Sequence, residues 1–245
     1  MTSLCAICLV GLLFAQSLRG PVGLIAEDPV LDLASGRIAV AGEGDFPASA
    51  SDPAAIGGVS AAWAAETSTQ TGISLVAVAA YGGASLKAAQ ESPTCKLGWT
   101  TLAGIGAVET GHGTFQGAHL LSNGRTSRPI LGPALDGREG FAAIRSTAES
   151  VVWHDDRVWD HAIGPLQFIP STWEKWQADG DGDGAYDPHN VFDATYAAAH
   201  YLCAAGTDMT TAAGWTRAVH SYNHSDAYVE DVLRRANTYA TLTPP

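Results

Sequence analysis

The sequence CKLGWTTLAGIGAVETGHG, residues 95–113, decides how the rest of the chain is organised. Apolar and small residues recur in it at intervals of three and four, which predicts a helix with one buried face. The residues of this face are Trp99, Leu102, Ala103 and Gly106. Glu109 lies three residues further along the same face. Gly111 and Gly113 predict the end of the helix, because glycine readily takes the left-handed conformation of a helix cap.

The position of Glu109 predicts an unusual carboxyl group. The C-terminal end of a helix carries partial negative charge, and the neighbouring residues are apolar, so both features disfavour the ionised form. We therefore expect a raised pKa for Glu109, as a general acid working near neutral pH requires. The alternative is a solvated residue in the last helical turn with no chemical role.

Length and composition predict one compact domain of nearly two hundred residues, without the ends of the chain. The chain has 245 residues, of which 46% are hydrophobic and 16% charged, so it can bury a large core. Its 13 basic and 25 acidic residues give a net charge of −12. This charge repels phosphate backbones and anionic bilayers, so we expect no nucleic-acid partner. A polysaccharide remains open as a ligand.

The N-terminal part predicts export. Residues 4–15 form an apolar run that is short for a membrane span but has the length of a signal-peptide core. No Lys or Arg precedes this run, so retention as a membrane anchor is the alternative. We assign residues 1–20 to a signal peptide or anchor, 21–59 to a flexible linker and 60–242 to the folded domain. We expect an extracellular or cell-wall location.

Two of the four cysteines, Cys5 and Cys8, lie inside the apolar run and would leave with a signal peptide. Cys95 and Cys203 then remain as an even pair in an exported chain. This predicts a disulfide between Cys95 and Cys203. The alternative is two buried free thiols.

The remaining helices are predicted from apolar spacing and from capping residues. A helix around residues 73–83 is apolar almost all round and should be buried. Residues 114–157 are rich in Gly, Pro, Ser and Asp, with a short helical window at 141–148, and are expected to form part of a groove. Further helices are expected from Pro170 with a Ser171–Glu174 capping box, over 194–205, over 215–222, and from an Asp226 cap onward.

Two polar residues, Gln167 and Tyr222, are candidates for binding a ligand. Gln167 stands alone in the apolar segment GPLQF, and its amide can donate and accept hydrogen bonds with a sugar N-acetyl group or hydroxyl. The alternative is a core glutamine bonded to the backbone. Tyr222 is expected at a helix end, where it reaches a cleft or, alternatively, belongs to the core. Asn223 follows it and ends the helix.

The segment DGDGDGAYDPHNVFD, residues 179–193, carries the pattern of a calcium-binding loop. Alternating acidic side chains converge on a hard cation, and a glycine at the sixth position permits the sharp turn. The expected ligands are Asp179, Asp181 and Asp183, the carbonyl of Ala185, and Asp187 directly or through water. Asn190 occupies the place of the usual last glutamate, so Asp193 is the better final ligand. The alternative is a solvated acidic loop.

Five segments, in order, resemble the B-type lytic murein transglycosylases found in exported actinobacterial proteins. They are GIGAVETGHG (104–113), ILGPALDG (130–137), VWDHAIGPLQFIPSTW (158–173), DGDGDGAYDPHNVFDA (179–194) and AVHSYNHSDAYV (218–229). The resemblance implies a mainly α, lysozyme-like domain of the goose-type and soluble lytic transglycosylase kind, with a substrate groove and an EF-hand-like calcium loop. It also implies that Glu109 is the acid/base, that Gln167, Tyr222 and Asn223 line the groove, and that Asp193 closes the calcium site.

The function implied is cleavage of peptidoglycan glycan strands without water, by a monomer with structural Ca²⁺ and no organic cofactor. An ordinary glycosidase uses two carboxylates, but no second acid accompanies Glu109 in its motif. The acetamido group of the substrate would then act as the nucleophile in place of a second carboxylate. The alternatives are a hydrolytic muramidase on the same fold and a non-catalytic, calcium-stabilised cell-wall binding module.

Overall fold

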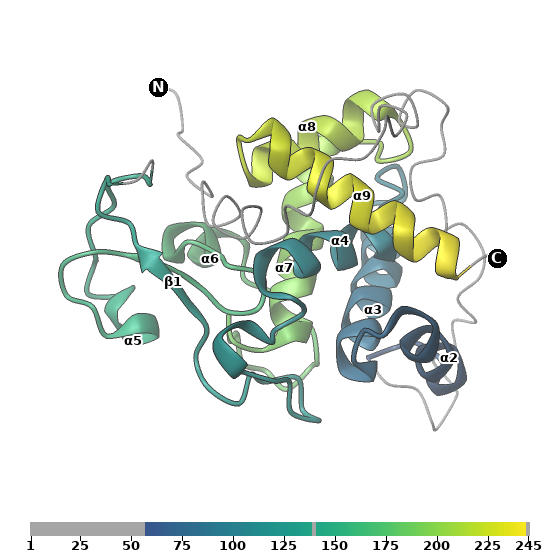
Figure 1. Cartoon of the computed structure of the whole chain (residues 1–245), viewed down its shortest axis with the longest axis horizontal. Coiled ribbons are helices and arrows are strands. Elements are labelled where there is room, and N and C mark those ends of the chain that lie inside the picture. Colours follow the sequence, from purple (N-terminus) through teal and green to yellow (C-terminus); the bar gives the residue numbers. More distant parts are fainter. Residues whose placement is uncertain (1–56, 139–140, 244–245) are drawn as a thin grey trace, which may run out of the picture.

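The computed structural model describes residues 57–138 and 141–243, and this part of the chain is mainly helical (Figure 1). The predicted leader and all but the last three residues of the predicted linker lie outside the described residues. The elements, in chain order, are α2 (Ala61–Thr71), α3 (Leu75–Glu91), α4 (Trp99–Thr110), the 3₁₀ turn η3 (Phe115–Gly117), β1 (Leu131–Ala134), α5 (Val151–His154), β2 (His161–Ile163), α6 (Pro170–Trp176), α7 (Val191–Gly206), α8 (Ala212–Tyr222) and α9 (Asp226–Leu242).

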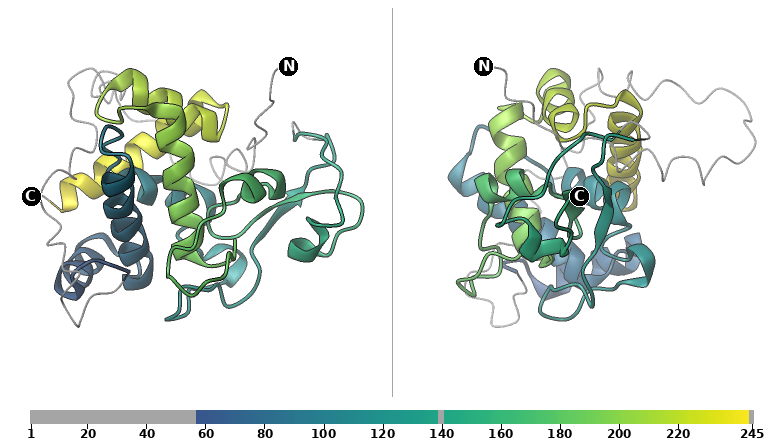
Figure 2. Two further views of the ribbon diagram at one scale, coloured as in Figure 1. Left: turned by 180° about the vertical axis from the view of Figure 1, so that it is seen from behind. Right: turned by 90° about the vertical axis from the view of Figure 1, so that its left-hand side faces the viewer.

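The helix α4 lies at the centre of the helical part of the molecule. It packs against α9 and α3, while α7 packs against α3 and α8 (Figures 1 and 2). The core between these helices holds large side chains with almost no exposed surface. They include Trp215, Tyr81, Tyr222, Phe168, Leu102 and Ile105. The end of α4 that carries Glu109 is therefore fixed by packing on several sides.

Two glycines in α4 allow its neighbours to approach closely. A Cβ atom at Gly104 would lie 2.8 Å from the Val232 carbonyl oxygen of α9, and one at Gly106 would lie 2.1 Å from the Tyr81 hydroxyl of α3. Real Cβ atoms do not make such contacts, so larger residues would push these helices apart. The segment GIGAVE thus sets the spacing around α4 as well as its apolar face.

Residues 118–138 and 141–163 form a smaller, irregular lobe beside the helical part of the molecule (Figure 1). The two short strands β1 and β2 pair antiparallel, and isolated bridges join Asp136 to Ala143 and Arg145 to Trp159. The predicted helical window at 141–148 is wrong, since its backbone takes part in these bridges. The short helix of this lobe is α5, a few residues later.

Two predicted helix caps are also wrong. The first residue of α6 is Pro170 and its N-cap is Ile169, whose side chain cannot accept a hydrogen bond, so the capping box at Ser171 does not form. The proline supplies the fixed backbone angle of a first helical residue instead. At α9 the cap is Ser225, whose hydroxyl accepts from the Tyr228 N–H, and Asp226 is the first helical residue.

The structure contains the predicted disulfide between Cys95 and Cys203. It ties the segment before α4 to the last turns of α7, and the Met209 N–H donates to the Cys95 carbonyl at 2.7 Å beside it. Val59 is buried, so the folded domain includes the end of the segment assigned to the linker.

Among the residues described, no helix alone has the length and apolar character of a membrane span. The helices α2 and α3 reach that length and composition only as a pair, and they are bent by 119° relative to one another.

Candidate functional site

Glu109 lies in the last turn of α4 and is almost completely buried, with 3% of its surface exposed. The helix ends directly after it, because Gly111 takes the left-handed conformation (φ 59°) and caps the helix. Burial raises the pKa of Glu109 from 4.5 to about 8, against a smaller lowering effect of a hydrogen bond. The direction agrees with the prediction, and a carboxyl group with this pKa is protonated at neutral pH.

The residue bonded to Glu109 is Tyr228, which the sequence reasoning missed. The Tyr228 hydroxyl of α9 donates to Glu109 Oε1 at 2.7 Å, and both side chains are buried. Tyr228 lies four residues before Val232 on the buried face of α9, so helical spacing alone could have placed it inward. This contact orients one carboxyl oxygen and leaves Oε2 without a hydrogen-bond partner among the described residues.

The loop from Gly164 to Phe168 contacts the helices on both sides of it. The Thr110 hydroxyl, next to Glu109, donates to the Pro165 carbonyl at 2.7 Å. The Tyr222 hydroxyl of α8 donates to the Leu166 carbonyl at 2.8 Å. The structure therefore fixes the predicted Gln167 segment beside the end of α4.

Gln167 sits at the tip of this loop in a left-handed conformation (φ 50°) and is 2% exposed. Its amide nitrogen donates to the Gly164 carbonyl at 2.9 Å. Its side-chain oxygen is buried and has no hydrogen-bond partner. A buried amide oxygen without a partner costs about 1–3 kcal/mol, so this atom is ready to accept a hydrogen bond from a ligand.

The structure gives Tyr222 a different place from the predicted groove position. Its side chain is fully buried and its hydroxyl already bonds the Leu166 carbonyl, so Tyr222 belongs to the core and supports the Gln167 loop from inside. Burial, and then the nearby Glu109, raise its pKa well above 10. Asn223 is also buried and ends α8. A substrate groove beside these residues stays a prediction.

A second hydrogen-bond network holds the turn that follows Glu109. His112 has a left-handed backbone (φ 61°), and its two ring nitrogens each lie 2.9 Å from a hydroxyl, those of Tyr81 and Tyr239. Burial lowers the pKa of His112 to about 4, so the ring is neutral. A neutral ring donates to one hydroxyl and accepts from the other, which satisfies both nitrogens.

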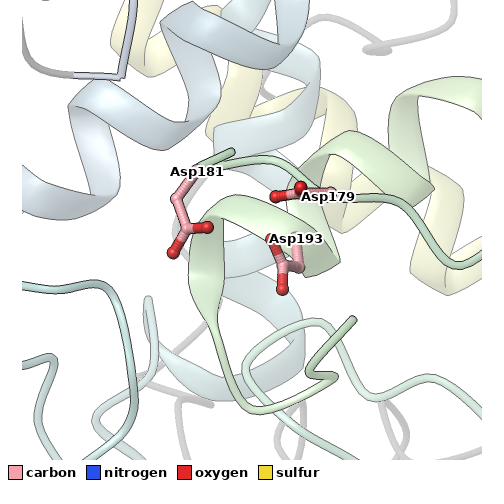
Figure 3. A group of neighbouring side chains, drawn as sticks. All are labelled: Asp179, Asp181 and Asp193. Atoms are coloured by element: carbon pink, nitrogen blue, oxygen red, sulfur yellow. The ribbon is translucent and has the colours of Figure 1, made fainter. Parts of the chain in front are cut away.

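The acidic loop brings together three of its predicted ligands. Carboxylate oxygens of Asp179, Asp181 and Asp193 all lie within 4.8 Å of one another (Figure 3). Two oxygens that bind one Ca²⁺ at about 2.4 Å are at most about 4.8 Å apart, so these side chains fit such an ion. Asp193 is 1% exposed, and burial raises its pKa to about 6.

The other predicted ligands lie outside this group. Asp183 is exposed and accepts from the Ala185 N–H at 2.7 Å. Asp187 forms an ion pair with Arg125 at 2.8 Å, which competes with a cation for the same carboxylate. On the opposite side, the ammonium group of Lys87 in α3 donates to the carbonyl of Gly180 at 2.8 Å and holds the start of the loop.

Residues 157–220 match the family model of the transglycosylase SLT domain. The match supports a lytic transglycosylase-like family. It covers β2, the Gln167 loop, α6, the acidic loop, α7 and most of α8, and it ends before Tyr222. No curated protein and no solved structure matches the chain. The mainly helical architecture together with this family match fits a lysozyme-like fold.

A protein with the buried carboxyl group of Glu109 should lose stability as the pH rises. The folded state holds the Glu109 proton up to about pH 8, whereas the unfolded chain releases it near 4.5. Unfolding therefore releases a proton between these values, and each pH unit costs about 1.4 kcal/mol of stability. We expect Glu109→Gln to unfold at a higher temperature than the wild type, by little at pH 5 and by more at pH 8. A difference that does not depend on pH would contradict the raised pKa.

The acidic loop of this transglycosylase-like domain should gain stability from calcium. A ligand that binds only the folded state at 100 times its Kd stabilises it by about 2.7 kcal/mol, or roughly 5–10 °C in Tm for a domain of this size. We expect Asp193→Asn to remove this shift, measured by thermal unfolding with Ca²⁺ and with chelator. Asp183→Asn is the matched control and should keep most of it. Equal losses in both variants would favour the larger ligand set predicted from sequence.

Proposed function

We propose that this protein is a peptidoglycan lytic transglycosylase with Glu109 as its single acid/base. It would cleave the β-1,4 bond between N-acetylmuramic acid and N-acetylglucosamine and leave a 1,6-anhydro-muramic end. The observation that carries this proposal is a buried carboxyl group with a pKa of about 8, held by Tyr228 next to the loop where the family match lies. The SLT match supports peptidoglycan as the substrate class.

A single carboxyl group agrees with the surroundings of Glu109. Desolvation and Tyr228 account for the shift of its pKa, and no second carboxylate among the described residues contributes to it. The acids of the smaller lobe have other partners. Asp160 accepts from Ser150 and His154, and Asp156 contacts His161. This arrangement supports a nucleophile that comes from the substrate, and water as the nucleophile is the hydrolytic alternative.

In the proposed reaction Glu109 takes part in two proton transfers, first as the donor and then as the acceptor. Glu109 donates its proton to the glycosidic oxygen, and the bond from that oxygen to the anomeric carbon breaks as the muramic acetamido oxygen attacks that carbon. The ionised Glu109 then takes the proton of the C6 hydroxyl, whose oxygen displaces the acetamido group and closes the 1,6-anhydro ring. Water is not consumed, and Glu109 is protonated again for the next cycle.

Two neighbouring residues have supporting roles in this proposal. The Tyr228 hydroxyl stays bonded to Oε1 and stabilises the carboxylate when Glu109 is ionised, which directs the proton transfer to Oε2. The unpaired side-chain oxygen of Gln167 accepts a hydrogen bond from a substrate N–H or hydroxyl.

The proposal includes a structural Ca²⁺, an exported location and a monomeric state. Asp179, Asp181 and Asp193 would hold the ion with backbone carbonyls. When bound, it neutralises the clustered carboxylates and fixes the loop ahead of α7. No organic cofactor is required, because proton transfer within the substrate complex is sufficient. The SLT domain implies peptidoglycan as the partner, and the cell-wall location stays a proposal.

The test is the chemical identity of the sugar ends released from purified peptidoglycan, read by mass spectrometry. We expect 1,6-anhydro-muramic ends. Reducing muramic ends would instead identify a hydrolytic muramidase. Binding to the cell wall without release of soluble fragments would identify a binding module.

A further inference from the structure

The guanidinium carbon of Arg145 in the smaller lobe lies over the ring of Trp159, 3.8 Å from the ring centroid. The two residues are directly opposite one another in an antiparallel bridge. Arg145 is exposed, and Trp159 is partly buried. A cation over an indole ring is a favourable arrangement, so this contact favours one position of the Arg145 side chain before any ligand arrives.

Within residues 57–138 and 141–243, Arg145 has no acidic partner. Five of the ten arginines in this acidic chain fall in residues 125–157. Arg125 is paired with Asp187, and Arg138 with Asp136 at 3.4 Å. Within the described part of the chain, no carboxylate forms an ion pair with Arg145. Among the described residues, none accepts a hydrogen bond from the Arg145 side chain, so its N–H donors are available to a ligand.

The pair formed by Arg145 and Trp159, called the stacked pair below, is connected to the candidate active site by the short strand β2. From Trp159 the chain runs through β2 to Gly164, the first residue of the loop that contacts Thr110. Five residues of extended chain span about 16 Å. A glycan strand whose scissile bond lies at Glu109 therefore brings its attached peptides within reach of this part of the lobe.

We propose that Arg145, presented by Trp159, binds a carboxylate of the short peptides attached to the muramic acid residues of the substrate. The inference rests on the proposed function and adds a specificity-determining residue to it. A planar guanidinium with free N–H donors matches a carboxylate in a bidentate arrangement. A sugar ring cannot stack on the face of Trp159 that Arg145 covers. A long polyanion is disfavoured by the net charge of −12.

The experiment compares two substrates with the full-length protein. One is glycan that carries its peptides, and the other is the same glycan after an amidase has removed them. We expect Arg145→Ala to lower kcat/KM about tenfold on the peptide-bearing glycan, through KM, and to leave cleavage of the peptide-free glycan unchanged. Arg145→Lys keeps the positive charge but lacks the planar guanidinium group. It should therefore lower kcat/KM on the peptide-bearing glycan by less than Arg145→Ala does. Added salt should reduce the preference of the wild type for the peptide-bearing glycan.

Arg138→Ala is the matched control, since it removes one exposed positive charge from the same lobe but leaves the stacked pair intact. It should behave as the wild type on both substrates. Equal loss on both substrates in Arg145→Ala, or no loss on either, would overturn the proposal. If the wild type releases no fragments from either glycan, the proposed function itself fails. Circular dichroism of each variant establishes that it is folded.

Discussion

Glu109→Gln should lower the rate of fragment release from purified peptidoglycan by at least about 10²–10⁴-fold, the range typical of general acid–base catalysis. The substitution keeps the size of the side chain and an oxygen that can accept from Tyr228. It removes the proton that has to reach the glycosidic oxygen and the carboxylate that has to take the C6 proton. Because the same group acts in both steps, we expect the loss at the upper end of this range. Turnover is measured as soluble muropeptides released per enzyme.

Tyr228→Phe is the informative companion variant. It keeps the packing of α9 on α4 but removes the hydrogen bond to Glu109 Oε1, which lowers the Glu109 pKa in the wild type. We expect a smaller loss of rate and a pH profile displaced to higher pH. Near-normal turnover in Glu109→Gln would show that another group supplies the proton. An unchanged pH profile in Tyr228→Phe would show that this contact does not tune the acid.

The parts of the fold that follow from local sequence were predictable. Apolar residues at helical spacing and the glycine at 111 predicted α4 and its end, and the same reasoning predicted the buried helix α3. The direction of the Glu109 pKa shift was also predictable, because apolar neighbours and the C-terminal end of a helix both disfavour the ionised form of a carboxyl group. The pairing of Cys95 with Cys203 followed from the even number of cysteines left in an exported chain.

The parts that depend on contacts between distant segments were not predictable in this way. Tyr228 reaches Glu109 across 119 residues of sequence, and no pattern local to either residue predicts that contact. The window at 141–148 has helical spacing, but its backbone pairs with other segments of the lobe, so tertiary contacts override the local preference. The ion pair between Arg125 and Asp187 likewise joins residues 62 positions apart, and Asp187 as a direct or water-bridged calcium ligand stays a prediction.

Removal of the disulfide should have the largest effect on stability. Cys95 and Cys203 are 108 residues apart in sequence, and in the chain-entropy model a crosslink that closes a loop of about 100 residues stabilises the folded state by about 4.7 kcal/mol. The bond fixes the start of α4 against α7, so its loss frees the helix that carries Glu109. We expect the double variant Cys95→Ala with Cys203→Ala to unfold at a Tm roughly 10–15 °C below that of the wild type.

The comparison needs the reduced wild-type protein as its control. If the crosslink is responsible, the wild type in strong reductant should unfold near the Tm of the double variant, and the double variant should not respond to reductant. Cys95 is buried, so loss of its sulfur also removes packing, and the reduced wild type separates that contribution from the crosslink. A double variant as stable as the oxidised wild type would mean that α4 is held by its packing against α9 and α3 alone. In that case the link between the two cysteines would have no role in presenting Glu109.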